Sequence, residues 1–222
     1  MYHVMDDRLY LLSLISEGEH QQQDFKYKVS DACKLARSVS AFANTDGGRL
    51  LIGVRDDGYL SGVKSEEEIF MMHQAAYKYC HPQPSIKFDT YRAIPSPSAS
   101  SRLRTIVVAT VPPSVRKPVY AIDADGRSRA YIRIADENIV ASPVHLALWR
   151  EQQQQWGMML TYTDTVHQLI AAMNSGRQTL SQIVRRSSVK RKKAITLLAR
   201  LVRFGVARWD YVGQQFVFSL TG

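Results

Sequence analysis

The stretch from Ala41 to Val63, AFANTDGGRLLIGVRDDGYLSGV, constrains the fold more than any other part of the chain. Two glycines follow an apolar helical pattern, and glycine ends helices because it adopts positive φ without strain. The run RLLIGV then has the continuous hydrophobicity of a buried strand. Asp57 and Gly58 form a strong turn signal. We therefore predict a helix over 30–43, a strand over 49–54 and a hairpin into the sequence YLSGV.

The positive charge of the chain is concentrated near its C-terminal end. Of the net +9, residues 1–160 contribute +1, from 19 Lys and Arg against 18 Asp and Glu. Residues 161–222 contribute +8, from 10 Lys and Arg against 2 Asp. This asymmetry is typical of a neutral domain joined to a small basic one, and basic domains most often bind phosphates. The alternative is a solvated basic surface without a ligand.

Helix and strand patterns are mixed through the first part of the chain, which predicts an α+β fold. The further elements expected there are a helix over 7–16, a strand over 24–27, a helix over 65–79 and strands within 86–134. The loop RAIPSPSASSRL is rich in Pro and Ser and is predicted to lie outside any core. A Gln-rich junction near 150–160 marks a boundary, so we predict domains over 1–155 and 156–222.

From residue 162 the expected order is helix, helix, turn, basic helix and β-hairpin, which predicts a winged helix-turn-helix. Thr179 is expected to cap the second of these helices, and Ser187 or Ser188 is expected to open the third. In this motif the N-terminal end of the second helix enters the major groove of DNA. That end contains four consecutive cations, Lys190, Arg191, Lys192 and Lys193. We predict that they bind DNA together with Arg185 and Arg186 before the turn and Arg208 on the wing. A winged helix that makes only protein contacts is the alternative.

Other site chemistries have little support in the sequence. There is no Gly-x4-Gly-Lys-Ser/Thr phosphate loop and no Gly-x-Ser-x-Gly elbow. His73, Cys80 and His81 have non-standard spacing for zinc, and a helix running into a loop explains them better. Two cysteines make no disulfide framework and fit a reducing cytosol. Because no apolar run reaches transmembrane length, we expect a cytoplasmic protein without a membrane partner.

Three segments of the first domain resemble the Schlafen AlbA-type (AlbA-two) family: GEHQQQDFK, SAFANTDGGRLLIGVRDDGYLSGV, and KPVY followed by RAYIRI. The family pattern is Gly-Glu-Ser, a short gap, Glu-Phe-Lys, Ala-Phe-Ala-Asn-Thr-x-Gly-Gly, an apolar run and Gly-Val-x-Asp, with a Tyr-Ile-Arg strand near the end. The resemblance covers about residues 10–145 and implies an α+β domain with a nucleic-acid-related role. Many prokaryotic members carry a winged helix after this domain and are described as transcriptional regulators.

The resemblance also carries an enzymatic alternative. Animal Schlafen proteins with these motifs include metal-assisted endoribonucleases that act on structured RNA. Their catalytic carboxylates match Glu19, Asp24 and Asp56, which implies that these three residues bind Mg²⁺ or Mn²⁺, cations that prefer oxygen ligands. The metal would activate water, and Lys26 would contact the phosphate. Asp24 stands where the family has Glu, and its side chain is one methylene shorter.

We interpret the chain as a nucleic-acid-binding protein, and more specifically as a DNA-binding transcriptional regulator. A homodimer is compatible with this interpretation, since many winged-helix regulators act as dimers. The first domain would supply dimerisation, ligand sensing or a second nucleic-acid surface, whose candidates are Lys26, Arg49, Arg55, Arg129 and Arg133. The alternatives are a metal-dependent endoribonuclease using Glu19, Asp24 and Asp56, and a protein-interaction module. No cofactor is expected outside the nuclease alternative.

Overall fold

The computed structural model describes residues 2–95, 102–153 and 159–222. The chain divides into two compact units, residues 1–140 and residues 141–222, and the fold is α+β. Half of the predicted Pro- and Ser-rich loop and part of the predicted Gln-rich junction lie outside the described residues. None of the helices that the structure describes is both long and apolar enough to span a bilayer.

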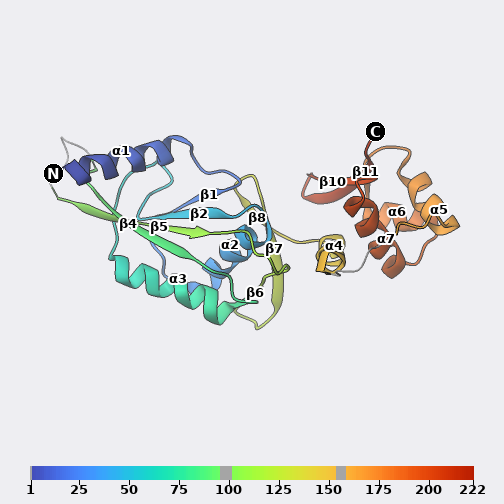
Figure 1. The fold of residues 1–222 in the computed structure, drawn as a ribbon, viewed down its shortest axis with the longest axis horizontal. Coiled ribbons are helices and arrows are strands. Elements are labelled where there is room, and N and C mark those ends of the chain that lie inside the picture. The colour runs from blue at the N-terminus through green and yellow to red at the C-terminus, as the bar shows by residue number, and fades with distance from the viewer. Residues whose placement is uncertain (1, 96–101, 154–158) are drawn as a thin grey trace. The chain divides into compact units, whose positions relative to one another are not determined.

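The first unit is built around a four-stranded sheet with the order β1-β2-β5-β4. Its strands are β1 (Gln23–Lys26), β2 (Gly48–Ile52), β5 (Arg104–Val111) and β4 (Lys87–Ala93). β1 and β2 are parallel, and the other pairs are antiparallel. Helix α1 (Tyr2–Ser16) covers one face, and helices α2 (Ala32–Asn44) and α3 (Ser65–Tyr79) lie on the other (Figure 1). Both faces are therefore buried, which explains the uniformly apolar central strands.

A second, antiparallel sheet packs against the opposite side of α2. Its order is β3-β6-β7-β8, with β3 (Cys80–His81), β6 (Tyr120–Ile122), β7 (Ser128–Ile134) and β8 (Glu137–Val140). One apolar cluster joins α2 to both sheets, and Phe42 and Val39 at its centre are fully buried. Because α2 is enclosed on two sides, ten of its thirteen residues are buried. The sequence motifs QDFK and GGRLLIGV lie on either side of α2 in the chain, so this buried helix holds both segments in place.

The structure confirms the predicted turn but not the predicted hairpin. The N–H of Gly58 donates to the carbonyl of Arg55 at 2.8 Å, which closes the turn. The sequence YLSGV forms no strand. It makes one isolated bridge, between Val54 and Leu60, and the N–H of Ser61 donates to the carbonyl of Gly53 at 2.9 Å beside it. Both edges of β2 are already paired, with β1 and β5, and Gly53 ends the strand with a φ of 96°. The prediction that β2 continues into a hairpin is therefore wrong.

The second unit contains four helices and a three-stranded sheet with the order β10-β11-β9 within the described residues. They are α4 (Pro143–Gln153), α5 (Asp164–Met173), β9 (Gln178–Thr179), α6 (Leu180–Ser187), α7 (Arg191–Arg203), β10 (Ala207–Val212) and β11 (Gln215–Leu220). Val144 of α4 joins the core formed by α5, α6 and α7, and Glu151 contacts Arg200 at 3.3 Å. These contacts place α4 in this unit, although the sequence-based ranges assigned it to residues 1–155.

The capping residues of α6 and α7 agree only in part with those expected from the sequence. Thr179 and Gln182 form the capping box of α6, so the predicted cap of that helix is confirmed. The prediction that Ser187 or Ser188 opens the next helix is wrong. The buried hydroxyl of Ser187 donates to the carbonyl of Ile183, and Ser188 turns the chain with a φ of 57°. Helix α7 therefore begins only at Arg191, with Lys190 at its N-cap and no side-chain cap.

His145 gives the second unit an acid-sensitive core. Its ring lies 4.6 Å from that of Trp209 and 4.8 Å from that of Phe216, centroid to centroid. Its Nδ1 is 2.6 Å from the Ser142 hydroxyl, and burial lowers the pKa of His145 from 6.5 to about 4. Between pH 6.5 and about 4, His145 is therefore protonated in the unfolded chain but neutral in the folded unit. The stability that His145 provides is fully present above pH 6.5 and is lost as the pH falls towards 4.

We expect this unit to lose about 3 kcal/mol of unfolding free energy between pH 6.5 and 4, and the variant His145→Phe to lose much less. All three tryptophans lie in residues 141–222, so tryptophan fluorescence in urea titrations reports this unit alone. Because the variant retains every carboxylate, the difference between the pH profiles of wild type and variant measures the contribution of His145 alone. Parallel pH profiles for the two proteins would contradict the assignment.

Candidate nucleic-acid interface and carboxylate cluster

The seven basic residues predicted to contact DNA in the second unit are all exposed. Where they have partners, these are neutral hydroxyl groups. Arg191 donates to Ser181 and Lys193 to Thr165, each at 3.2 Å, and Arg186 donates to Ser175. Within the described part of the chain, no carboxylate forms an ion pair with any of the seven. Their positive charge is therefore uncompensated by the protein.

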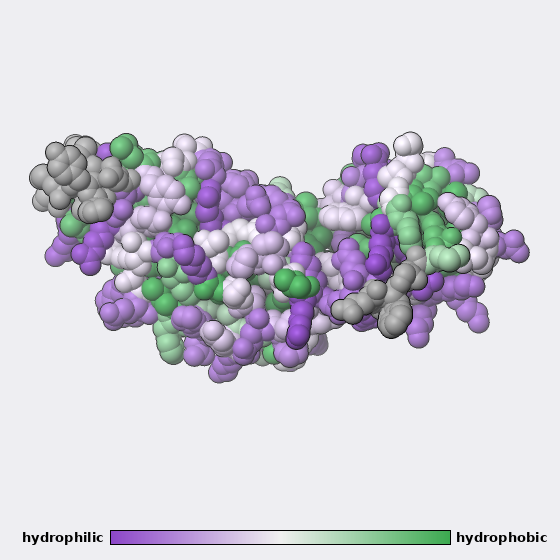
Figure 2. Space-filling view, in the orientation of Figure 1, coloured by the Kyte–Doolittle hydropathy of each residue, from purple (hydrophilic) through white to green (hydrophobic). Residues whose placement is uncertain are grey.

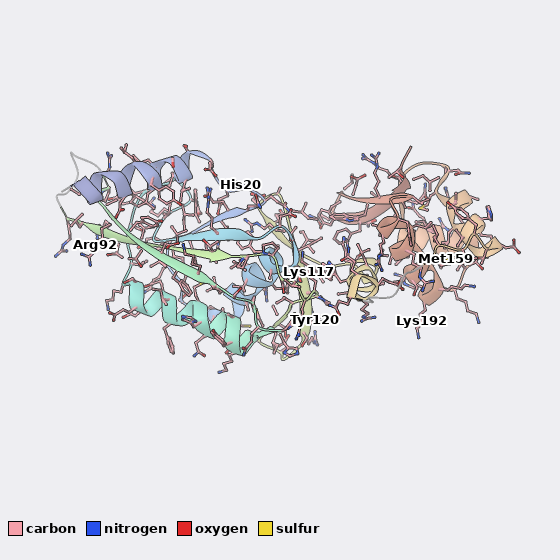
Figure 3. All side chains as sticks on the ribbon, in the orientation of Figure 1. His20, Arg92, Lys117, Tyr120, Met159 and Lys192 are labelled. Atoms are coloured by element: carbon pink, nitrogen blue, oxygen red, sulfur yellow. The ribbon has the colours of Figure 1, made fainter. Side chains whose placement is uncertain are left out.

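The N-terminal end of α7 concentrates this charge at an electrostatically unfavourable place. The amide dipoles of a helix sum to a partial positive charge at its N-terminus, where acidic side chains are favourable and basic ones are not. Lys190 to Lys193 occupy this end, and no side chain caps its free N–H groups. Lys192 extends away from the ribbon (Figure 3). A bound anion would satisfy both the cations and the N–H groups.

Two of the three predicted catalytic carboxylates lie together in the first unit. Glu19 accepts the N–H of Phe25 at 2.8 Å. Its pKa is raised by partial burial, by a hydrogen bond to the carboxyl group of Asp24 and by the charge of that group. Asp24 itself is buried, with an exposed fraction of 5%. The structure therefore brings Glu19 and Asp24 into direct contact.

Asp24 is held by two cations. Its Oδ2 lies 2.7 Å from the Nζ of Lys26, and its Oδ1 lies 3.4 Å from the Nη2 of Arg133. Arg133 is 2% exposed and also donates to the Gln23 carbonyl and the Asn138 side chain. The sequence-based suggestion that Arg133 lies on a nucleic-acid surface is therefore wrong. Arg133 balances a buried carboxylate and ties β1 to β7 and β8.

Asp56 lies apart from the other two carboxylates. It is exposed and lines a surface pocket of about 520 Å³ with Tyr27, Arg55 and Asp57. Across residues 2–95, 102–153 and 159–222, no three His, Cys, Asp or Glu side chains are grouped so that they could hold a metal ion. With Asp24 already neutralised by cations, these carboxylates do not fit a divalent metal. Asp57, rather than Asp56, accepts a backbone N–H in the turn, from Tyr59 at 3.1 Å.

The three consecutive glutamines before Asp24 are structural. Gln21 donates to the carbonyl of Arg133 at 2.7 Å, and its side-chain oxygen accepts the N–H of Ala135 at 3.0 Å. Gln22 donates to the carbonyl of Asp46 at 3.0 Å. Gln23 is fully buried, donates to carbonyls at the end of α1 and accepts from Arg49. Amide side chains serve here because each can both donate and accept a hydrogen bond.

Asn44, in the segment Ala-Phe-Ala-Asn-Thr, has a structural role. Its Nδ2 donates to the carbonyls of Val119 and Tyr131 at 2.8 and 2.9 Å. Its Oδ1 accepts the N–H of Val119 at 2.7 Å. The side chain is 3% exposed, so water cannot replace these bonds. Asn44 therefore fastens the second sheet to the end of α2.

We expect Asn44→Ala to lower the unfolding free energy of the first unit by about 3 kcal/mol, because buried backbone groups of Val119, just before β6, and of Tyr131, on β7, lose their partners. Far-UV circular dichroism in urea measures this loss. Ser30→Ala, an exposed change before α2, serves as the control. If Asn44→Ala were as stable as this control, the hydrogen bonds would not have the role assigned to them.

Comparison with known proteins shows the family to which the chain belongs. The family model described as Schlafen, AlbA_2 matches residues 19–142. The curated proteins include no match. Among solved structures, the DIP2311 protein from Corynebacterium diphtheriae is similar at 18% identity and a TM-score of 0.46. The similarity covers 81% of this chain and 32% of that chain, so the present chain spans about a third of its length. By its family model, the chain belongs to the Schlafen AlbA_2 family, and this membership indicates a nucleic-acid-binding domain.

Proposed function

We propose that the chain is a DNA-binding transcriptional regulator that contacts DNA through the N-terminal end of α7. The single observation that carries the proposal is the cluster of exposed, uncompensated cations from Lys190 to Lys193 at the positive end of this helix. Such a cluster is unfavourable in the free protein and becomes favourable when phosphates are bound.

The arrangement of the second unit supports a winged helix-turn-helix. Helices α5, α6 and α7 pack on one core and are followed by the antiparallel ribbon β10–β11, the order of that motif. The ribbon turns through Gly213 and Gln214, which have φ values of 55° and 61° as a two-residue hairpin turn requires. Arg208 lies on β10, and its Nε is 3.4 Å from the Ser219 hydroxyl. The ribbon would be the wing.

In this binding mode the basic residues have different roles. Arg191 bridges to α6 through Ser181, and Lys193 bridges to α5 through Thr165, so both are positioned by the fold. Lys190 and Lys192 are exposed, and long flexible lysine side chains suit backbone phosphates. Arg185 and Arg186, before the turn, would contact the flanking phosphates. Base contacts at the start of α7 would provide any sequence preference.

Fluorescence anisotropy with a labelled DNA duplex of about 20 base pairs, two helical turns, tests the proposal. The full-length chain is expected to bind saturably at low salt and to be released by added salt. Heparin should compete, since it carries dense negative charge. Absence of binding at low salt would overturn the proposal and leave the protein-interaction alternative.

A further inference from the structure

A small pocket lies in the first unit, beside the beginning of α2. Its volume is about 230 Å³, and it is formed by the segment that joins β1 to α2 and by the first two turns of that helix. Val29 and Leu35, both buried, form its apolar side, and Ser30 and Ser38 contribute hydroxyl groups. Because β1 is part of the sheet and α2 is enclosed between two sheets, the pocket is built on rigid elements.

Positive charge dominates the lining of this pocket. Lys26, Lys28 and Lys34 line it together with one carboxylate residue, Asp31, and the Lys26 ammonium is already paired with Asp24 at 2.7 Å. Lys34 lies 3.9 Å from Asp31 but is 78% exposed, so this ion pair contributes little. No ion pair or hydrogen bond to the Lys28 ammonium occurs within the described part of the chain. Two of the three cations are therefore available to a ligand.

A hydroxyl donor completes the polar lining. Ser38 is 4% exposed, and its oxygen accepts the side-chain N–H of Asn138 at 2.9 Å. Because a serine hydroxyl can accept and donate at once, its own proton remains available for a ligand oxygen. Asp31 is the N-cap of α2, and its carboxylate already accepts the N–H of Lys34 at 3.0 Å, which partly compensates the positive end of the helix dipole at this pocket.

We propose that this pocket binds a phosphate group. Ammonium groups and a hydroxyl donor around a small cavity match the charge and the acceptor oxygens of a phosphate. The volume lies below the range of about 300–1,000 Å³ for drug-sized ligands, so it suits one phosphate with part of an attached group. The phosphate belongs either to a free nucleotide or to a nucleic-acid strand, and both ligands would present the same group to the pocket.

Amine footprinting of the full-length chain tests the site directly. Lysine acetylation is followed by mass spectrometry with inorganic phosphate, adenosine monophosphate or single-stranded oligothymidine present. Lys28 and Lys34 are expected to be protected, while Lys64 and Lys87, also highly exposed, keep their reactivity. Protection by phosphate or the mononucleotide identifies a free ligand, and protection by the oligonucleotide alone identifies a strand. No protection by any probe, or equal protection of Lys64 and Lys87, overturns the proposal.

The variant Lys28→Gln/Lys34→Gln provides the second measurement, and Lys64→Gln/Lys87→Gln is its matched control. Protection of Lys26, which remains in both variants, reports occupancy of the pocket itself. The first variant is expected to need about tenfold more probe for each lost charge-assisted hydrogen bond. Unchanged protection of Lys26 would overturn the proposal. Because the site shares no residue with α7, its failure would leave the DNA-binding proposal intact, and the reverse also holds.

Discussion

Replacing Asp24 by Asn is expected to lower the unfolding free energy of the first unit by about 3–5 kcal/mol. The substitution keeps the shape of the side chain but leaves the charge of Arg133, which is 2% exposed, without its carboxylate. Far-UV circular dichroism in urea should show the loss. Tryptophan fluorescence should not, since all three tryptophans lie in residues 141–222.

A double variant distinguishes the buried ion pair from a general effect of substitution. Replacing both partners, Asp24→Leu with Arg133→Met, removes the uncompensated charge, and such replacements are often close to neutral. We therefore expect the double variant to regain most of the stability that Asp24→Asn loses. A loss below about 1 kcal/mol for Asp24→Asn alone would contradict the role assigned to the pair.

The second large effect concerns DNA binding. Replacing Lys190, Arg191, Lys192 and Lys193 by Gln is expected to weaken binding of the duplex about 100-fold or more at low salt, because up to four phosphate contacts are lost. The matched control replaces four exposed cations of the first unit, Lys64, Lys78, Lys87 and Arg116. Since it changes the net charge equally, it should retain most of the affinity.

The unfolding free energy of the variant distinguishes the loss of a DNA contact from damage to the fold. Removing cations from the positive end of α7 should leave the second unit at least as stable as before, because the substitution relieves an unfavourable interaction with the helix dipole. Tryptophan fluorescence in urea measures this directly. A variant that lost both affinity and stability would not support the proposed contact.

The nuclease alternative has its own test. Incubating the chain with transfer RNA and Mn²⁺, alongside Asp56→Ala, would reveal metal-dependent cleavage. Glu19 and Asp24 are in contact, but Asp56 is not grouped with them, and Lys26 and Arg133 already neutralise Asp24. We therefore expect no cleavage that depends on both Mn²⁺ and Asp56. Such cleavage would require these carboxylates to rearrange and would replace the regulator interpretation.

Two local signals in the sequence predicted local structure correctly. The turn at Asp57 and Gly58 and the capping box at Thr179 depend on neighbouring residues, and both are present. The face of the molecule seen in Figure 2 mixes hydrophilic and hydrophobic residues on both units, so hydropathy alone does not indicate the proposed interface. The charge asymmetry of the sequence is the feature that suggested it.

Long-range partners could not be predicted in the same way. Asn44 bonds to Val119 and Tyr131, which are 75 and 87 positions away. Strand β7 is buried on both faces from Ala130 to Arg133, so no alternation of polar and apolar residues shows that Arg133 points into the protein. The three carboxylates of the nuclease alternative illustrate the same point, since Asp56 is not grouped with Glu19 and Asp24 among the residues that the structure describes. Motif spacing gives the order of three carboxylates but not whether the chain brings them together.

The most direct test of the central claim is the salt dependence of duplex binding by the wild-type chain and by the four-residue variant of α7. Plots of the logarithm of affinity against the logarithm of salt concentration are compared between about 50 and 200 mM salt. The proposed interface predicts a steep slope for the wild type and a slope shallower by about 3–4 for the variant, close to 0.9 for each lost phosphate contact. Equal slopes for the two proteins would contradict it.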